Sequence, residues 1–165
     1  MKRKSRGLVI GKFMPPHKGH EHLVHFAQQR VDCLSIILFT KRAEAIPGVL
    51  RLEWMRQIFP EIPILNITDE HPIDFADPAI WELWIASIRK VYPAGPELVF
   101  SSEDYGHELA RRLGARHVMV DRERACVPVS AARIRERPLD FLEFMQPCVQ
   151  KHFTLPDRCR TKGRD

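Results

Sequence analysis

Short apolar runs alternate with amphipathic stretches along the chain, and this alternation restricts the fold more than any other feature of the sequence. An apolar run without regular polar residues is typical of a strand buried on both faces of a parallel sheet. Amphipathic stretches with apolar residues three and four apart are typical of helices that cover such a sheet. We expect five strands, at residues 7–12, 33–40, 62–67, 98–101 and 117–120.

The stretches between these strands predict the connecting helices, and Gly114 is a suitable C-terminal cap for one of them. Strands that alternate with helices indicate a fold of the α/β class. We predict a three-layer, Rossmann-like, doubly wound parallel sheet of about five strands, whose ligands bind at the carboxyl ends of the strands near the switch point. The expected helices are 18–30, 50–59, 78–92, 103–113, 130–136 and 139–145.

The length of 165 residues suits one domain, which we expect at 1–153, followed by a basic and flexible tail at 154–165. The longest mainly apolar run, 34–39, is far too short to cross a bilayer. The basic N-terminus leads into a strand instead of the apolar region of a signal peptide. We therefore expect a cytoplasmic protein with no membrane partner.

The net charge of +5 fits an anionic partner, but much of it lies in residues 2–6 and 158–164. Basic termini are usually solvated tails, so the charge does not indicate a nucleic-acid partner. The four cysteines are scattered, and none has the spacing of a zinc ligand. We expect free thiols, with Cys33 as a small buried apolar residue, and no protein metal site.

The segment 11–20, Gly-Lys-Phe-Met-Pro-Pro-His-Lys-Gly-His, follows the first strand and opens a helix. A helix N-terminus offers free N–H donors to phosphate, and His17 and His20 add directional donors. Gly11 and Gly19 allow close approach of a ligand, and Lys12 adds a cation. Two histidines at this spacing also occur without function or as half of a metal site. The joint occurrence of strand, glycines, proline and histidines favours a phosphate site.

A second motif, at residues 127–135, also places phosphate-binding groups at a predicted helix start. The Ser130 hydroxyl can cap the helix or bind phosphate, and Arg135 can reach a triphosphate with its forked donors. An ordinary capped helix with exposed arginines is the alternative. Taken together, the two motifs favour a clamp around a nucleoside triphosphate.

Residues 11–20 closely resemble the opening of the NMN adenylyltransferase domain of NadR-type proteins, within the HxGH nucleotidylyltransferase superfamily. Residues 127–135 resemble the C-terminal superfamily signature Ile-Ser-X-Thr-X-Ile-Arg, with Val129 for the first isoleucine and Ala132 for the threonine. The resemblance implies that 1–153 is a nucleotidylyltransferase domain. It implies catalytic roles for His17, His20 and Lys12, and ATP binding by Gly11, Phe13, Gly19, Ser101, Ser102, Ser130, Ile134 and Arg135.

For the acceptor, the resemblance points to Trp84, whose flat indole suits a cationic pyridinium ring. Packing in the core is the alternative role of this side chain. Arg51 and Arg42 are candidates for the acceptor phosphate, with solvated arginines as the alternative. Ser101 and Ser102 come from the segment 100–106, which also resembles the NadR pattern, and Glu103 can cap the following helix.

The expected reaction is transfer of AMP from ATP to NMN, giving NAD and pyrophosphate, with Mg2+ carried mainly by the ATP phosphates. The acceptor stays open between NMN, nicotinate mononucleotide and a phosphorylated alcohol, and a non-catalytic nucleotide sensor is a further alternative. The sequence has no Walker A loop, so we expect the adenylyltransferase module without a kinase. The expected partners are ATP and a mononucleotide, and a homo-oligomer is left open.

Overall fold

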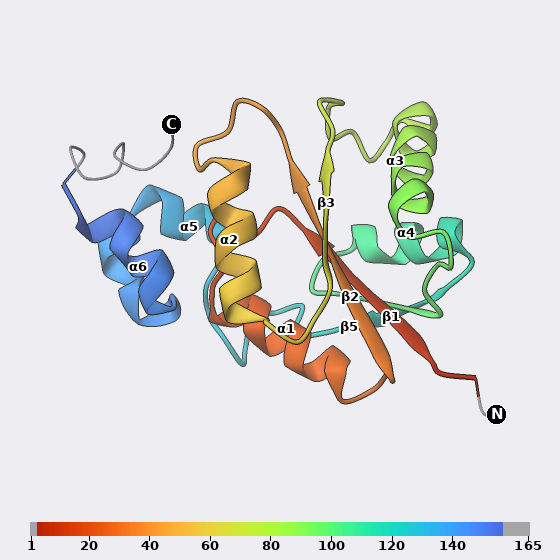
Figure 1. Cartoon of the computed structure of the whole chain (residues 1–165), viewed down its shortest axis with the longest axis horizontal. Coiled ribbons are helices and arrows are strands. Elements are labelled where there is room, and N and C mark those ends of the chain that lie inside the picture. Colours follow the sequence, from red (N-terminus) through yellow and green to blue (C-terminus); the bar gives the residue numbers. More distant parts are fainter. Residues whose placement is uncertain (1–2, 157–165) are drawn as a thin grey trace.

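The computed structural model describes residues 3–156 of the chain (Figure 1). Most of the predicted tail at 154–165, including Cys159, therefore lies outside the described residues. Within the described range, no helix is both long enough and apolar enough to cross a membrane.

A five-stranded sheet forms the middle of the molecule, and all of its strand pairs are parallel. The strand order is β3-β2-β1-β4-β5, so the chain builds outward from β1 in one direction and then in the other. This reversal puts the switch point between β1 and β4 and confirms the predicted doubly wound sheet. The strands are β1 (Arg6–Gly11), β2 (Cys33–Thr40), β3 (Ile64–Thr68), β4 (Leu98–Ser101) and β5 (Arg116–Met119).

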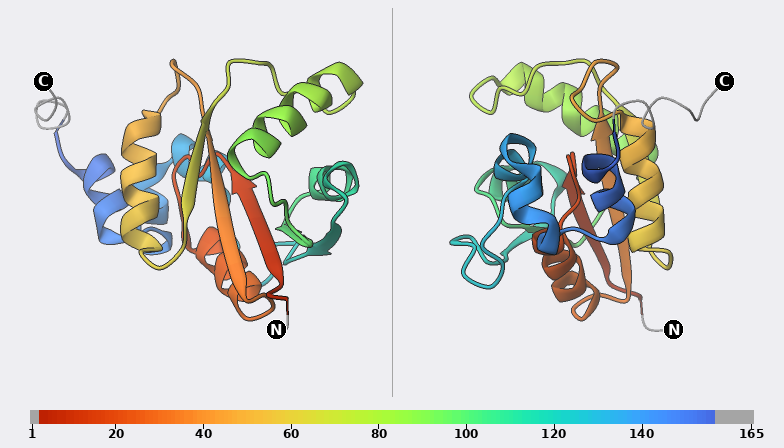
Figure 2. Two further views of the ribbon diagram at one scale, coloured as in Figure 1. Left: turned by 45° about the vertical axis from the view of Figure 1, so that its right-hand side comes forward. Right: turned by 90° about the vertical axis from the view of Figure 1, so that its left-hand side faces the viewer.

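Helices cover both faces of the sheet, as its apolar strands require (Figures 1 and 2). On one face Val9 packs with residues of α1 and α2, and on the other Leu8 and Ile10 pack with residues of α3 and α4. Adjacent residues of one strand thus enter two separate cores, which explains why β1 is apolar at consecutive positions. The covering helices are α1 (Lys18–Gln28), α2 (Gly48–Ile58), α3 (Pro78–Val91) and α4 (Tyr105–Leu113).

The C-terminal part of the chain forms a third apolar cluster beside α2 (Figure 2). In it, Trp54 of α2 packs with Ile134, Met145 and Val149. The elements of this part are α5 (Ala131–Glu136), a 3-10 helix at Pro138–Phe144 and α6 (Pro147–Thr154). The sequence predicts a helix at 139–145 but not α6, whose only buried residue is Val149.

The structure differs from the sequence predictions at Cys33 and at the start of α4, and it agrees with them at Gly114. Cys33 is exposed instead of buried, because it is the first residue of β2 and lies at the end of the strand that reaches solvent. The helix expected from residue 103 begins at Tyr105, and Asp104 occupies the N-cap position without a side-chain cap bond. Gly114 caps the end of that helix with φ +71°, as predicted.

Candidate functional site

A cavity of about 390 Å³ opens at the carboxyl ends of the strands, where the doubly wound fold is expected to bind a ligand. The loop or turn after each of the five strands contributes to its wall. The predicted site residues that line it are Gly11, Lys12, Phe13, His17, Gly19, His20, Trp84, Ser101, Ser102 and Arg135. The predicted residues that are not part of its lining are Arg42, Arg51, Ser130 and Ile134.

The two histidines are fixed by a reciprocal cap at the start of α1. The backbone N–H of Gly19 donates to Nδ1 of His17 at 3.0 Å, and the backbone N–H of His17 donates to Nδ1 of His20 at 3.2 Å. The two rings stack with centroids 3.7 Å apart. A Cβ at residue 19 would lie only 2.8 Å from Cε1 of His17, so the glycine is required for this arrangement.

These bonds determine where each ring carries its proton. Because Nδ1 accepts a hydrogen bond in both rings, the neutral tautomer carries its proton on Nε2. Burial, followed by the charge of Arg124, lowers the pKa of His17 to about 4. Burial, His17 and Arg124 likewise lower the pKa of His20 well below its ordinary value. The pair therefore presents two neutral Nε2–H donors at neutral pH, beside the N-terminus of α1.

Arg51 has a structural position instead of the predicted contact with an acceptor phosphate. Its side chain is fully buried, and Nη1 donates to the carbonyl oxygens of Lys12 and Phe39. Nε donates to Ile46, and Nη2 forms an ion pair with Glu44. The guanidinium thus ties the loops after β1 and β2 together behind the cavity wall.

The other residue predicted for the acceptor phosphate, Arg42, is exposed outside the cavity, and its backbone N–H donates to Glu70. Lys12 does line the cavity, where its Nζ lies 3.6 Å from Oε1 of Glu44. Its side chain keeps 35% exposure, so this cation is accessible to a ligand.

The second motif meets the first at Arg135. Its Nη1 donates to the carbonyl oxygen of Met14 at 2.6 Å, which joins segments that are 121 residues apart. Ser130 is the N-cap of α5 and accepts from the backbone N–H of Arg133, while Ile134 is fully buried in the third apolar cluster. Ala132, where the signature has threonine, is exposed and is not part of the cavity lining.

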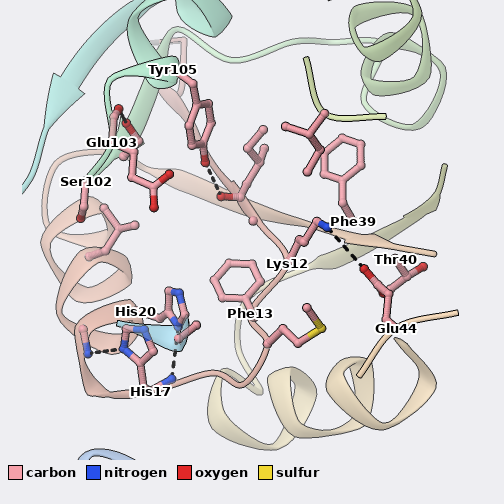
Figure 3. A pocket seen from close by; sticks show the side chains of 18 of the residues that line it. Lys12, Phe13, His17, His20, Phe39, Thr40, Glu44, Ser102, Glu103 and Tyr105 are labelled. Carbon is pink, nitrogen blue, oxygen red and sulfur yellow. Dashed lines mark hydrogen bonds and ion pairs between the residues drawn. The ribbon is translucent and has the colours of Figure 1, made fainter. Parts of the chain in front are cut away.

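Aromatic side chains form the side of the cavity away from the histidines. Trp84 stacks on Phe39 with centroids 5.4 Å apart, and Phe75 meets Trp84 edge-on at 5.7 Å. Trp84 is only 9% exposed, so it belongs to the core and to the cavity wall at once. Figure 3 shows His17 and His20 on one side and Phe39 on the other, with Phe13 between them.

The serines after β4 differ in their surroundings. The Ser101 hydroxyl donates to the carbonyl oxygen of Glu103 and lies 2.8 Å from Nε2 of His117, so it is engaged within the protein. Ser102 and Glu103 both line the cavity. Glu103 does not take the capping role considered for it, and its carboxylate lies 3.7 Å from Nη2 of Arg124.

Several lining residues were missed by the sequence analysis: Glu44, Asp69, His71, Phe75 and Arg124. Each of them follows the carboxyl end of a strand, and this position is the signal that could have found them. Arg124 has a left-handed backbone, with φ 53°, and its Nη1 donates to the carbonyl oxygen of Val129. Its charge lowers the pKa of both histidines, and with Arg135 it gives the cavity wall two arginines.

No protein-family model matches the chain. The trifunctional NAD biosynthesis/regulator protein NadR of Escherichia coli (strain K12) is 31% identical to it over 170 residues, which cover 92% of this chain and 41% of that protein. The chain thus spans less than half the length of the curated relatives that it matches. This similarity confirms the predicted resemblance to NadR-type proteins.

Solved structures of other proteins share the fold. A crystal structure of NadR in complex with NAD and AMP-PNP matches with a TM-score of 0.70 and 18% identity, covering 92% of this chain and 47% of that chain. A bifunctional NMN adenylyltransferase/ADP ribose pyrophosphatase from Francisella tularensis, complexed with AMP and a Mn ion, matches with a TM-score of 0.58 and 17% identity. That match covers 87% of this chain and 43% of the other.

Proposed function

We propose that this homologue of the NadR proteins is an NMN adenylyltransferase, which transfers AMP from ATP to NMN and releases pyrophosphate. The observation that carries the proposal is the pair of neutral imidazoles at the start of α1, each with an Nε2–H donor, with Arg124 near them and Arg135 in the wall of the same cavity. Neutral donors and fixed cations next to a helix N-terminus suit a triphosphate.

This arrangement supports the following course for the reaction. An oxygen of the NMN phosphate attacks the α-phosphorus of ATP, and the bond from that phosphorus to the pyrophosphate oxygen breaks. His17 and His20 donate hydrogen bonds to phosphoryl oxygens as the charge moves, and Arg124 and Arg135 stabilise the departing pyrophosphate. The attacking phosphate is already ionised, so no general base is needed. Catalysis consists mainly of positioning and electrostatic stabilisation.

A divalent cation is expected to arrive with the triphosphate, as Mg2+ bound to ATP. Two of the cavity carboxylates support this assignment, because they are paired with cations. Glu44 pairs with Arg51 and Lys12, and Glu103 lies near Arg124. The related Francisella protein complexed with AMP and a Mn ion also supports the use of a divalent cation.

The aromatic side of the cavity supports NMN as the acceptor. A cationic nicotinamide ring is attracted to indole and phenyl faces such as those of Trp84 and Phe39. The carboxylate of Asp69 lines the same cavity and has a buried oxygen without a hydrogen-bond partner. Nicotinate mononucleotide would bring another carboxylate towards Asp69, whereas the carboxamide of NMN offers N–H donors. The charges therefore favour the amide over the acid.

The test is a panel of acceptors with ATP, followed by pyrophosphate release. We expect NMN to give the highest kcat/KM, and equal or faster reaction with nicotinate mononucleotide would refute the choice of acceptor. In the same assay His20→Ala should lower kcat by at least about 100-fold, because one preorganised donor is worth about that much. His25→Ala, on the exposed side of the same helix, is the matched control and should keep wild-type kcat. Near-normal activity of the His20 variant would remove the histidine pair from the mechanism.

A further inference from the structure

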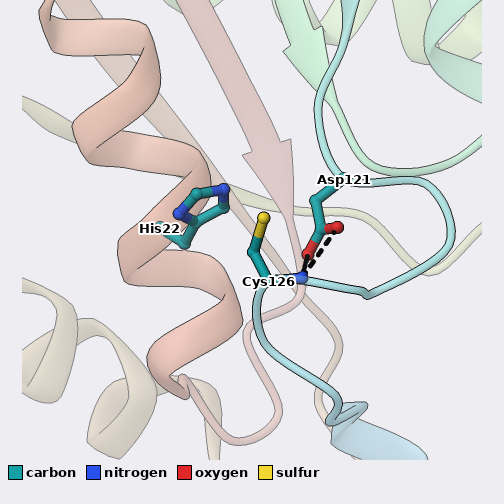
Figure 4. Close-up of side chains that lie close together, drawn as sticks. All are labelled: His22, Asp121 and Cys126. Carbon is teal, nitrogen blue, oxygen red and sulfur yellow. Dashed lines mark hydrogen bonds between the residues drawn. The ribbon is translucent and has the colours of Figure 1, made fainter.

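His22, Asp121 and Cys126 bring an imidazole, a carboxylate and a thiol together outside the cavity (Figure 4). Their ligand atoms all lie within 4.8 Å of one another. His22 belongs to α1, whereas Asp121 and Cys126 belong to the loop between β5 and α5. Among the residues that the structure describes, this is the one group of three such side chains placed closely enough to hold a metal ion.

We propose that these three side chains form a binding site for a borderline divalent cation, Zn2+, which fastens the loop 120–130 to α1. Nitrogen, sulfur and carboxylate oxygen together are a donor set that suits zinc and not Mg2+. The thiolate and the carboxylate together neutralise the two charges of the ion. Three protein ligands leave one tetrahedral position for water.

The geometry is close to what a tetrahedral site requires. Metal–ligand distances of about 2.0–2.3 Å put the ligand atoms of such a site roughly 3.3–3.8 Å apart. The three side chains therefore need to close by only about 1 Å. Cys126 is exposed and His22 is half-buried, so rotation of their side chains can supply this movement without a change in the core.

Asp121 is already oriented for such a role by the loop around it. Its carboxylate accepts hydrogen bonds from the backbone N–H groups of Ala125, Cys126 and Val127, at 2.8–3.3 Å. These bonds draw the thiol of Cys126 towards the carboxylate. Hydrogen bonds that orient a ligand carboxylate are a regular part of metal sites.

A metal ion bound at this site would affect the cavity through Arg124. Arg124 lies in the loop between the two ligands Asp121 and Cys126, and its side chain lines the cavity. His22 follows His20 by two residues on α1. A bound ion would therefore hold the arginine in place against the helix that carries the histidine pair. None of the three ligands lines the cavity itself, so the ion would act as a positioning element and not in the transfer step.

The experiment titrates the full, reduced, metal-free chain with Co2+, a spectroscopic substitute for Zn2+, and then displaces Co2+ with Zn2+. We expect one equivalent to give a thiolate-to-cobalt charge-transfer band that Zn2+ removes. Cys126→Ala should abolish the band, whereas Cys33→Ala, the loss of another exposed cysteine, should leave it intact. His22→Ala should weaken binding at least about tenfold, since even changes around metal ligands cost that much. His25→Ala is its control on the same helix.

Hydrogen exchange gives a second readout that does not depend on activity. We expect Zn2+ to slow amide exchange over residues 121–127 in the wild type and to leave it unchanged in Cys126→Ala. The proposed site would be refuted if the full chain gave no thiolate-to-cobalt band, or if the band persisted in Cys126→Ala. Binding of one equivalent without slower exchange in the loop would overturn the fastening role.

Discussion

Replacing Gly19 with alanine should displace the His17 ring while changing the free energy of unfolding very little. The new Cβ would lie 2.8 Å from Cε1 and 2.9 Å from Nδ1 of His17, which is too close for any real Cβ. The ring must move by roughly half an ångström to reach ordinary contact distance. It cannot move freely, since Nδ1 is bonded to the Gly19 N–H and the ring stacks on His20.

The expected effect on folding is small because two contributions oppose each other. Losing the N-cap bond of His17 costs about 1 kcal/mol. Replacing glycine by alanine within the first turn of a helix contributes about 0.8–1.0 kcal/mol in the other direction. The free energy of unfolding should therefore change by less than about 1 kcal/mol.

The expected effect on the reaction is large. Catalytic groups must be held within about 0.5 Å of their productive positions, and a misplacement of about 1 Å can cost 100-fold. We expect Gly19→Ala to lower kcat for pyrophosphate release by roughly 30- to 100-fold, equivalent to about 2–2.7 kcal/mol of barrier. Denaturant unfolding measures stability in the same preparation, and Lys18→Ala, an exposed neighbour, is the control. A kcat within threefold of the wild type, or a loss of stability above about 2 kcal/mol, would refute the reasoning.

Three further predictions follow from the burial and position of single groups. The lowered pKa of His17, about 4 against an ordinary 6.5, means that protons bind the unfolded chain first, so the free energy of unfolding should fall as the pH falls from 6.5 towards 4. Between pH 6 and 8 both rings of the free protein should stay neutral, and an NMR titration of either ring with a midpoint near 6.5 would contradict the lowered pKa values. Arg51→Met should cost about 3–5 kcal/mol in denaturant unfolding, because Glu44 keeps a buried charge without its arginine partner. Ala132→Thr should leave kcat within twofold, since residue 132 is exposed away from the cavity, and a larger gain in rate would show that the signature hydroxyl matters here.

The fold could be predicted because its strongest determinant is local. A strand that is apolar at consecutive positions, as β1 is at Leu8, Val9 and Ile10, has to be covered on both sides, and the following helical stretches supply the cover. The helix α6 was missed because its packing is not local. Only Val149 of that helix is buried, and its partners include Trp54 of α2, almost a hundred residues earlier.

The geometry of the candidate site could be worked out from residue spacing only where its residues are contiguous. His17, Gly19 and His20 form one reciprocal cap, so their spacing carries the geometry directly. The surroundings of Arg51 are fixed by carbonyl groups of two separate loops, and no pattern around it indicates that its side chain turns inward.

The same limit applies to groups whose members lie far apart in the chain. Cys126 has no zinc-ligand spacing in sequence, yet the fold brings it beside His22, more than a hundred residues away. The cavity residues that the sequence did not predict lie in loops that follow strands. For these residues, the position after a strand indicates membership of the cavity, whereas the local motif does not.

The cavity is polarised, and its polarity matches the two proposed substrates. Arg124 and the start of α1 lie beside the histidine pair, and Arg135 lines the same cavity, so that side suits the four negative charges of a triphosphate. Asp69 lines the cavity together with the aromatic rings, which suits a ring that carries a positive charge. Two substrates of opposite local charge would thus be sorted to opposite sides, and their phosphates would meet in between. Lys12, exposed in the wall and only loosely paired with Glu44, is the cation best situated to offset the repulsion of those phosphates.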